Sequence, residues 1–479
     1  MLTMKAVRGA GWLVFSRFLG RFIDFFTLLI LARVLMPADF GVVALALTLV
    51  VVVDTVLEVP VTQALTRLSA IDKSHLDTGF TLGFLRGLVI SAVIVAAAWP
   101  FSLIYNDRAL ILLVIALAAG PIARGLYSPA MVHFVRELSF RQAFISEFIG
   151  KLAAFASAIG VVMAGGGYWA IVANFVMAPM AATVASYVLA PYRPSLSLAR
   201  FNQFSSFVGW FSSAQIVSAL NWQFDRVLLG AFVDKTMLGR YTVASDLAVL
   251  PTQSLIGPAM QPVMAAFSNI SDDPERLKLA FLKAARFAML ISAPICIGLA
   301  LTGDLVIVLL LGAKWQETGE FLRLLALSVV TIPYFQALYS FALAIDRPVA
   351  IFRINLFDLA IRVVFVSLGL YLFSVTGTII ARLLTSVAMF GCYMIFARML
   401  AGVGLRAQIK NIWKIGVASA AMAGCVMLLR AAVAPVMLPV IVELVLLAAY
   451  GAAVYAATLY GCGVRLIIGS RRLEWVDRW

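Results

Sequence analysis

The sequence predicts an all-α, polytopic membrane protein with about 14 transmembrane helices, arranged as two pseudo-symmetric bundles around a central cavity. Composition is the first observation that predicts this class. Of the 479 residues, 63% are hydrophobic and 13% are charged, and the mean hydropathy is +1.02. Soluble domains of any size are far less apolar.

The spacing of the apolar runs is the second observation, because each run approaches the roughly 20 residues that a helix needs to cross a bilayer. The runs are continuous rather than alternating, and lipid offers no hydrogen bonds to an open backbone, so helices are favoured over a barrel. In chain order the runs occupy residues 12–31, 41–60, 80–104, 109–128, 144–164, 168–190, 203–232, 241–266, 287–310, 324–344, 354–374, 376–397, 415–434 and 438–462.

An internal repeat is the third observation. Shifting the chain by 198 residues brings Gly41 onto Gly239 and Pro60 onto Pro258, among other matches. The seventh helix would then enter the membrane from the same side as the first, so the halves would be parallel repeats. The predicted parts are an N-terminal bundle of helices 1–6 (residues 1–200), a C-terminal bundle of helices 7–12 (201–400), and two additional helices with a cytoplasmic tail (401–479).

The basic residues between the runs predict the orientation. Of the 37 Lys and Arg, 22 fall on the side of the N-terminus and 6 on the other side. Short cytoplasmic loops collect basic residues, so both termini are predicted to be cytoplasmic. The net charge of +14 is spread thinly beside helix ends, which favours contact with membrane lipids over nucleic acid. No small-residue cleavage site follows the first run, so it is predicted to remain as a span.

The remaining nine basic residues lie inside the apolar runs. Each costs roughly 2.5–3.5 kcal/mol at a helix centre on insertion scales, so such residues usually face a partner or a water-filled cavity. A hydrated, cationic chamber is the simplest common explanation. The nine are Arg17, Arg21, Arg86, Arg124, Lys151, Arg226, Arg362, Arg382 and Arg430.

Six of these cations and one acid are predicted to line the chamber. Arg17, Arg21 and Asp24 share one face of the first helix through their i, i+4, i+7 spacing. Arg86 has no acidic neighbour within its own helix. The full set is Arg17, Arg21, Asp24, Arg86, Arg124, Lys151 and Arg226.

Several structural alternatives remain open for this set. Arg21 could pair with Asp24 while Arg17 reaches the cytoplasmic headgroups, and Arg124 could reach the headgroups in the same way. Lys151 could form a local pair with Glu147, four residues earlier. In addition, the second span carries two acids that could neutralise neighbouring arginines, Asp54 and Glu58.

Two further groups of residues suggest movement and coupling. Pro60, Pro258 and Pro262 interrupt the second and eighth spans, where they act either as hinges or as static kinks. Asp225, Asn355 and Asp358 offer the oxygen ligands that a sodium ion or a transported proton requires. Asp358 could instead pair with Arg362, one turn away.

Motifs for catalysis are missing from the sequence. There is no G-x-x-x-x-G-K-[ST] phosphate loop, and the chain has only two histidines. Its four cysteines are widely spaced within predicted spans, which indicates neither a disulfide framework nor a zinc site. We therefore expect no catalytic residue, no resident metal and no cofactor, and we expect a transporter rather than an enzyme.

The chain resembles the Wzx-type polysaccharide flippases of the multidrug/oligosaccharidyl-lipid/polysaccharide exporter superfamily. The segments that carry the resemblance are LARVLMPADFG at residues 31–41, NWQFDRVLLG at 221–230 and LGRYTVA at 238–244. The resemblance implies fourteen helices, alternating access and transfer of an undecaprenyl-diphosphate-linked oligosaccharide across the bacterial inner membrane. It also implies a polysaccharide polymerase and a chain-length regulator as partners.

Lipid II flippases, a related branch, have arginines and an acid on the first helix at positions similar to Arg17, Arg21 and Asp24. Their sodium site uses acids on helices seven and eleven, for which Asp225 and Asp358 are the matching residues here. The spacing from Asn355 to Asp358 departs from that branch's pattern, which puts sodium binding in doubt.

Three other functions compete with a flippase, and each predicts features of its own. A multidrug antiporter of the same superfamily should line its cavity with acids and aromatic residues rather than arginines. A membrane-embedded glycan polymerase should have a large periplasmic loop or catalytic acids, and the loops here are short. A structural scaffold would leave the charges inside the spans without a purpose.

Overall fold

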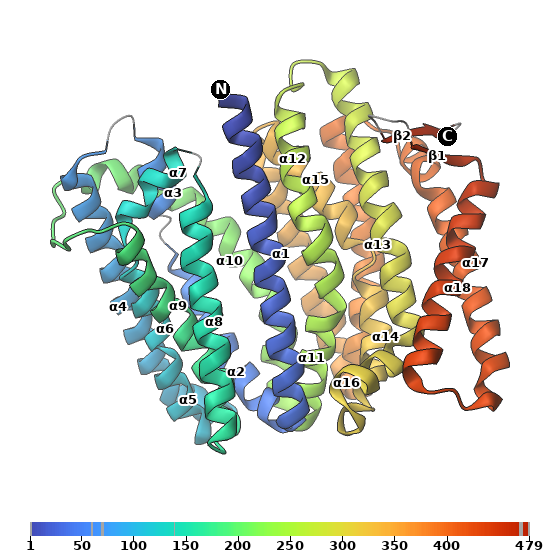
Figure 1. Ribbon diagram of the computed structural model, residues 1–479, viewed down its shortest axis with the longest axis horizontal. Helices are drawn as coiled ribbons and strands as arrows, with labels where there is room; N and C mark the ends of the chain where they lie inside the picture. The colour runs from blue at the N-terminus through green and yellow to red at the C-terminus, as the bar shows by residue number, and fades with distance from the viewer. Residues whose placement is uncertain (1, 59–60, 69–70, 138, 469–472, 478–479) are drawn as a thin grey trace. The chain divides into compact units, whose positions relative to one another are not determined.

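A computed structural model describes residues 2–58, 61–68, 71–137, 139–468 and 473–477 of the chain. Within these ranges the side chains of residues 2–17, 63, 67, 202–215 and 465–477 are not described. The described chain is helical apart from a short hairpin near its end (Figure 1). It divides into two compact units, Met1–Thr242 and Val243–Trp479.

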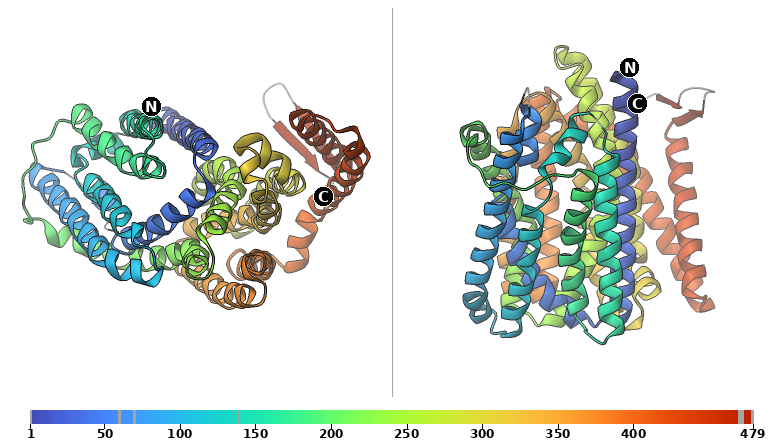
Figure 2. Two further views of the ribbon diagram at one scale, coloured as in Figure 1. Left: turned by 90° about the horizontal axis from the view of Figure 1, so that it is seen from below. Right: turned by 60° about the vertical axis from the view of Figure 1, so that its left-hand side comes forward.

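The first unit contains the elements from α1 to the start of α11. Helix α8 packs along both α1 and α9 (Figure 2), while α6 packs on α4 and α9, and α10 packs on α2. The elements are α1 (Leu2–Val34), α2 (Pro37–Val56), α3 (Val61–Arg67), α4 (Lys73–Ile104), α5 (Ala109–Leu117), α6 (Ala119–Gly125), η1 (Pro129–Met131), α7 (Val132–Arg136), α8 (Arg141–Met163), α9 (Trp169–Leu189), α10 (Phe201–Phe232) and α11 (Lys235–Pro251).

Local chemistry explains where two helices of this unit begin. Helix α2 starts with Pro37, whose fixed φ suits a first turn, and the Asp39 carboxylate accepts the Met36 N–H at 2.8 Å. Helix α4 is capped by Asp72, whose carboxylate accepts the His75 N–H at 3.0 Å. Both caps satisfy amide groups that have no partner inside the helix.

The connection between α9 and α10 lies along the first turns of α4. The Tyr192 hydroxyl donates to the Asp77 carboxylate at 2.5 Å, and the Ser197 N–H donates to the Thr81 hydroxyl at 2.8 Å. These bonds attach the connecting segment to the first unit over most of its length.

The second unit is built around α13. Helices α14, α15, α17 and α18 all pack on it, and its core contains the aromatic rings of Phe281, Tyr334 and Phe341. The elements are the π-helical turn η2 (Thr252–Ile256), α12 (Gly257–Ser268), α13 (Pro274–Leu311), η3 (Ala313–Trp315), α14 (Thr318–Ser328), α15 (Ile332–Ala344), α16 (Pro348–Ala401), α17 (Leu405–Val433), η4 (Ala434–Val436), α18 (Val440–Gly461), β1 (Val464–Ile468) and β2 (Leu473–Asp477).

The helices reproduce the predicted spans. Among the described residues, eight helices are long and apolar enough to cross a membrane, or ten if each of two bent pairs forms one span. Helix α16 is two helices joined at Phe373 and Ser374, where φ of Ser374 is +54°, so it supplies the predicted spans 354–374 and 376–397. Helices α1, α10 and the α11–α12 pair coincide with three further predicted runs.

Two further features describe how the chain is organised. The last two helices, α17 and α18, pack on α13, and the boundary between the two compact units lies near residue 242. After α18, the strands β1 and β2 pair in antiparallel fashion, with Val464 opposite Asp477 and Ile468 opposite Leu473.

Candidate functional site

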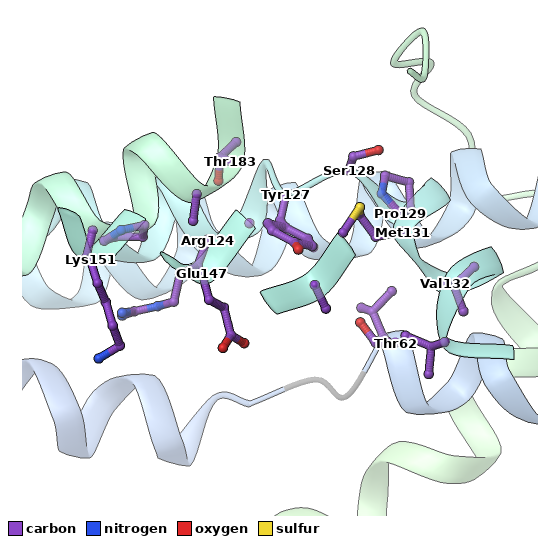
Figure 3. A pocket seen from close by; sticks show the side chains of 18 of the residues that line it. Thr62, Arg124, Tyr127, Ser128, Pro129, Met131, Val132, Glu147, Lys151 and Thr183 are labelled. Atoms are coloured by element: carbon purple, nitrogen blue, oxygen red, sulfur yellow. The ribbon is translucent and has the colours of Figure 1, made fainter. Parts of the chain in front are cut away.

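A cavity of about 740 Å³ opens inside the first unit (Figure 3). Residues of α1, α3, α4, α6, α7, α8 and α9 line it. Most of the lining is apolar, as in small-molecule sites generally. The charged residues in the lining are Asp24, Glu58, Arg86, Arg124, Glu147 and Lys151.

Two glycines bring the arginine-bearing helices α4 and α6 together. A Cβ atom on Gly125 would lie 2.4 Å from the Gly83 carbonyl oxygen, and one on Gly83 would lie 3.0 Å from the Gly125 carbonyl oxygen. Only a backbone without side chains allows this approach, which is a common way for membrane helices to pack. The contact places Arg86 of α4 and Arg124 of α6 on either side of one carboxylate.

Arg86 completes the end of α2. In a continuing helix the Asp54 carbonyl would accept the Glu58 N–H, but that N–H donates to Thr55 instead, at 3.3 Å. Arg86 supplies the missing donors: its Nη2 lies 3.3 Å from the Asp54 carbonyl oxygen, and its Nε lies 3.1 Å from the Leu57 carbonyl oxygen. A cation at a helix C-terminus is also favoured by the helix dipole. Arg86 therefore has a structural role as well as a place in the cavity lining.

Asp54 bridges the two guanidinium groups. Its Oδ1 accepts from Arg86 Nη2 at 2.9 Å, and its Oδ2 lies 3.0 Å from Arg124 Nη2. The Arg124 guanidinium also lies over the ring of Phe175, 5.5 Å from its centre. One carboxylate thus serves two cations, which leaves this triad with one net positive charge.

Lys151 pairs with Asp24. Its Nζ lies 2.5 and 2.6 Å from the two carboxylate oxygens, so the lysine of α8 reaches across to α1. The expected local pairs, Lys151 with Glu147 and Asp24 with Arg21, do not describe this arrangement. The geometric reason is that α8 packs directly on α1, which brings the two residues closer than their sequence neighbours.

The lining is balanced in charge rather than cationic among the described residues. Three cations face three carboxylates in the lining, and Asp54 adds a fourth acid next to it. Of the other predicted cations, Arg21 is exposed on α1 and Arg226 is half-buried on α10, and neither belongs to the lining. The side chain of Arg17 lies outside the described residues.

The cavity continues into a neutral part that the sequence did not reveal. Thr62, Ser128, Met131 and Val132 lie together, away from Lys151 and Arg124, and Tyr127 lies between the two groups (Figure 3). Hydroxyl-bearing residues are common in apolar helices, so no sequence signal distinguishes these positions. The sequence analysis named Asp54 as an acid that could neutralise neighbouring arginines, and in the structure it pairs with both Arg86 and Arg124.

The predicted coupling residues lie in different units. Asp225 is buried on α10 and accepts a hydrogen bond from the Tyr241 hydroxyl at 2.9 Å. Asp358 pairs with Arg362 on the next turn of α16, with oxygen and nitrogen 3.2 Å apart, and Asn355 is half-buried one turn earlier. The described residues contain no group of three or more His, Cys, Asp or Glu that could hold a metal ion. Ion coupling therefore stays a prediction.

The predicted hinges coincide with breaks in the helices. Pro60 itself is outside the described residues, but α2 ends at Val56 and α3 begins at Val61. Pro258 and Pro262 lie in α12, directly after the π-helical turn Thr252–Ile256. Movement of the helices about these breaks stays a prediction.

Comparisons with known proteins agree on family and fold. Residues 30–320 match the family described as "polysaccharide biosynthesis protein". The succinoglycan biosynthesis transport protein ExoT of Rhizobium meliloti is 25% identical over 331 residues, 67% of this chain, and the match spans 65% of the length of ExoT. The lipopolysaccharide biosynthesis protein WzxC of Escherichia coli is 22% identical over 423 residues, which are 86% of this chain and 85% of WzxC.

Solved structures share the fold. The lipid II flippase MurJ, in an inward closed conformation, has a TM-score of 0.70 with 15% identity, covering 94% of this chain and 98% of MurJ. An inward-facing multidrug transporter of the MATE family, from the same exporter superfamily, has a TM-score of 0.64 with 15% identity, covering 80% of this chain and 96% of that one. The family match covers more than half of the sequence, and the chain therefore belongs to the polysaccharide biosynthesis protein family, with the fold of the multidrug/oligosaccharidyl-lipid/polysaccharide exporters.

Proposed function

We propose that this protein transfers a lipid-linked oligosaccharide, undecaprenyl-diphosphate-linked in the simplest case, from the cytoplasmic to the periplasmic leaflet of a bacterial inner membrane. Family membership and the names of ExoT and WzxC support a role in building a surface or exported polysaccharide. The observation that carries the proposal is the pair Arg124 and Lys151 in the wall of a cavity between apolar helices. Cations within a membrane usually pair with acids and mark the paths of substrates or ions, and these two do both: each has a carboxylate partner and lines the cavity.

The diphosphate would bind by exchanging partners. Arg124 and Lys151 are held by Asp54 and Asp24 in the structure, and phosphate oxygens would replace these carboxylates one for one. Arginine suits this step because its guanidinium presents two parallel donors to phosphate and stays charged. The polyprenyl chain would remain in the lipid, so the protein needs to enclose only the polar head.

The direction and the partners belong to the same proposal. With both termini cytoplasmic, the cycle would open first to the cytoplasm and then to the periplasm, by alternating access. The membrane potential opposes export of an anion, so a sodium or proton gradient, or consumption of the product by a polymerase with its chain-length regulator, would drive the cycle. In this proposal the protein transports its substrate without changing any covalent bond.

The test is transfer in proteoliposomes. The probe is a polyprenyl-diphosphate-N-acetylglucosamine that carries a fluorophore on the sugar, and dithionite added outside bleaches only exposed label. We expect wild-type protein to speed transfer well above that of empty liposomes, and Arg124→Ala with Lys151→Ala to abolish the gain. Arg430→Ala is the matched control, because Arg430 pairs with Asp304 within the second unit and is not part of the cavity lining. Equal transfer by the double variant and wild type would contradict the assigned site.

Export of a cationic compound is the second candidate function, and one observation favours it. Asp24, Glu58 and Glu147 line the cavity in the same number as the cations. Acids of this kind attract organic cations. In the same proteoliposomes, uptake of ethidium with no transfer of the labelled lipid would support the antiporter, and the reverse result supports the flippase.

A further inference from the structure

The carboxylate of Asp54 is a feature of the site that substrate binding alone does not explain. An acid beside an anion-binding cavity weakens anion binding, because like charges repel. Yet Asp54 lies between two arginines, with both carboxylate oxygens engaged at 2.9 and 3.0 Å. Its role must therefore concern the arginines.

The two arginines differ in what else holds them. Arg86 also donates to the carbonyl oxygens of Asp54 and Leu57, so it stays in place without the Asp54 carboxylate. Arg124 has one carboxylate contact and one ring contact, with Asp54 and Phe175. Its Nε is buried and has no hydrogen-bond partner among the described residues. Arg124 thus depends on Asp54 for its position, and its partly exposed side chain in the cavity lining can be reached by a ligand.

We propose that Asp54 is a positioning and release residue for Arg124: it orients the empty guanidinium, and it competes with the phosphate of the substrate so that the bound lipid can leave. The inference rests on the proposed function. Arg124 would move between two anions, one fixed to α2 and one carried by the substrate. Fixing the competitor to the protein keeps binding reversible at a site that would otherwise hold a diphosphate tightly.

The competition makes a prediction that a purely structural role does not. Asp54→Asn removes the charge but keeps an oxygen that accepts a hydrogen bond. The anion should then bind more tightly and leave more slowly, so KM and kcat should both fall. A hydrogen bond to a charged group contributes about 1.5–3 kcal/mol, so the change in affinity should be about tenfold or more.

The experiment uses the full chain in proteoliposomes and two probes. Inorganic pyrophosphate serves as a soluble competitor whose inhibition constant reports binding, and the labelled lipid reports KM and kcat. For Asp54→Asn we expect an inhibition constant lowered about tenfold, with kcat reduced to a similar extent. Asp54→Glu keeps the charge and should return both values to within about threefold of wild type. Asp304→Asn breaks a comparable arginine pair in the second unit and should change neither value.

The outcomes separate the two claims. An unchanged or raised inhibition constant in Asp54→Asn, with transfer by wild type intact, overturns the role of Asp54 and leaves the proposed function standing. If Asp54→Asn does not fold, Asp54→Glu decides: an inhibition constant lowered tenfold although the charge remains would overturn the inference. Failure of wild type to transfer the lipid or to respond to pyrophosphate overturns the proposed function, and the role of Asp54 with it.

Discussion

Gly41 and Gly239 pack backbone against backbone. A Cβ atom on Gly41 would lie 1.9 Å from the Lys235 carbonyl oxygen, and one on Gly239 would lie 1.8 Å from the Pro37 carbonyl oxygen. The two contacts are equivalent under the 198-residue shift, which brings Gly41 onto Gly239 and Pro37 onto Lys235. This reciprocal pattern is what a local two-fold axis produces, and it supports the internal repeat at the level of single atoms.

Alanine at either glycine should destabilise the protein. The added methyl group meets backbone oxygen, which cannot move aside as a flexible side chain can, and overpacking typically costs about 1–3 kcal/mol. We expect Gly41→Ala and Gly239→Ala to lower the midpoint of thermal unfolding in detergent. Gly416→Ala is the control: a Cβ atom there meets nothing within 4 Å, and alanine favours a helix, so its midpoint should stay or rise. Equal effects at the three sites would contradict the contact.

Substitutions in the pair Asp24–Lys151 should affect stability and transport differently. Removing one partner leaves a charge between apolar helices, so Asp24→Asn and Lys151→Met should each lower stability. The double variant should recover part of the loss, with a coupling of about 0.5–1 kcal/mol, because both groups are partly accessible. A double-mutant cycle of unfolding midpoints measures this coupling. Transfer of the labelled lipid should remain low in the double variant, and recovery of transfer would contradict the role of Lys151.

Arg86 and Arg124 should respond differently to substitution. Arg86→Ala removes donors from two main-chain carbonyl groups and one carboxylate, so we expect a loss of about 2 kcal/mol or more in unfolding free energy. Arg124→Ala should cost less stability and more transport. Thermal unfolding and lipid transfer, measured on the same preparations, show which of the two variants loses more stability and which loses more transport. Similar unfolding midpoints for the two variants would show that Arg86 does not complete α2.

The orientation can be tested with cysteine labels. In a variant whose four native cysteines are replaced, Ser271→Cys and Gln316→Cys both lie in exposed positions between helices. The basic residues predict that residue 271 faces the cytoplasm and residue 316 the periplasm. A membrane-impermeant maleimide added to intact cells should label Gln316→Cys only. Labelling of Ser271→Cys alone would reverse the predicted topology.

The bond between Tyr192 and Asp77 should weaken at high pH. Burial, and next the hydrogen bond to Asp77, raise the pKa of Tyr192 above its usual value of 10.0. The folded state therefore holds this proton more tightly than the unfolded chain does, so the stabilisation is present below pH 10 and is lost as the pH rises above it. Wild type should unfold at a higher temperature than Tyr192→Phe at about pH 8, and the difference should shrink above about pH 10. A constant difference would contradict the prediction.

Much of the fold was predictable because hydrophobicity is a local property. The apolar runs marked the spans, including the separate runs that Phe373 and Ser374 divide within α16. The end of α2 was harder to predict from the sequence. It depends on hydrogen bonds from Arg86 of α4 to main-chain carbonyl groups at the end of α2. Near residue 60 the sequence indicated a break, through Pro60, but not what stabilises it.

The charged site was predictable in its members but not in its pairs. Arg86, Arg124 and Lys151 all lie in the lining of one cavity, and their role in binding a substrate stays a prediction. Their partners come from other helices: Asp24 lies 127 residues from Lys151, and Asp54 lies 32 residues from Arg86. Such pairs depend on how helices pack, which spacing along one helix does not encode. For this reason the lining was expected to be cationic, whereas its described residues are balanced.

The way α2 ends has a consequence for genetics. An arginine that completes a broken helix is needed before any cargo arrives, so its loss removes protein from the membrane as well as activity from the cell. Screens that score only polymer at the cell surface would count Arg86 among the residues that touch the cargo. Measuring how much protein accumulates for each variant would distinguish loss of folded protein from loss of cargo binding.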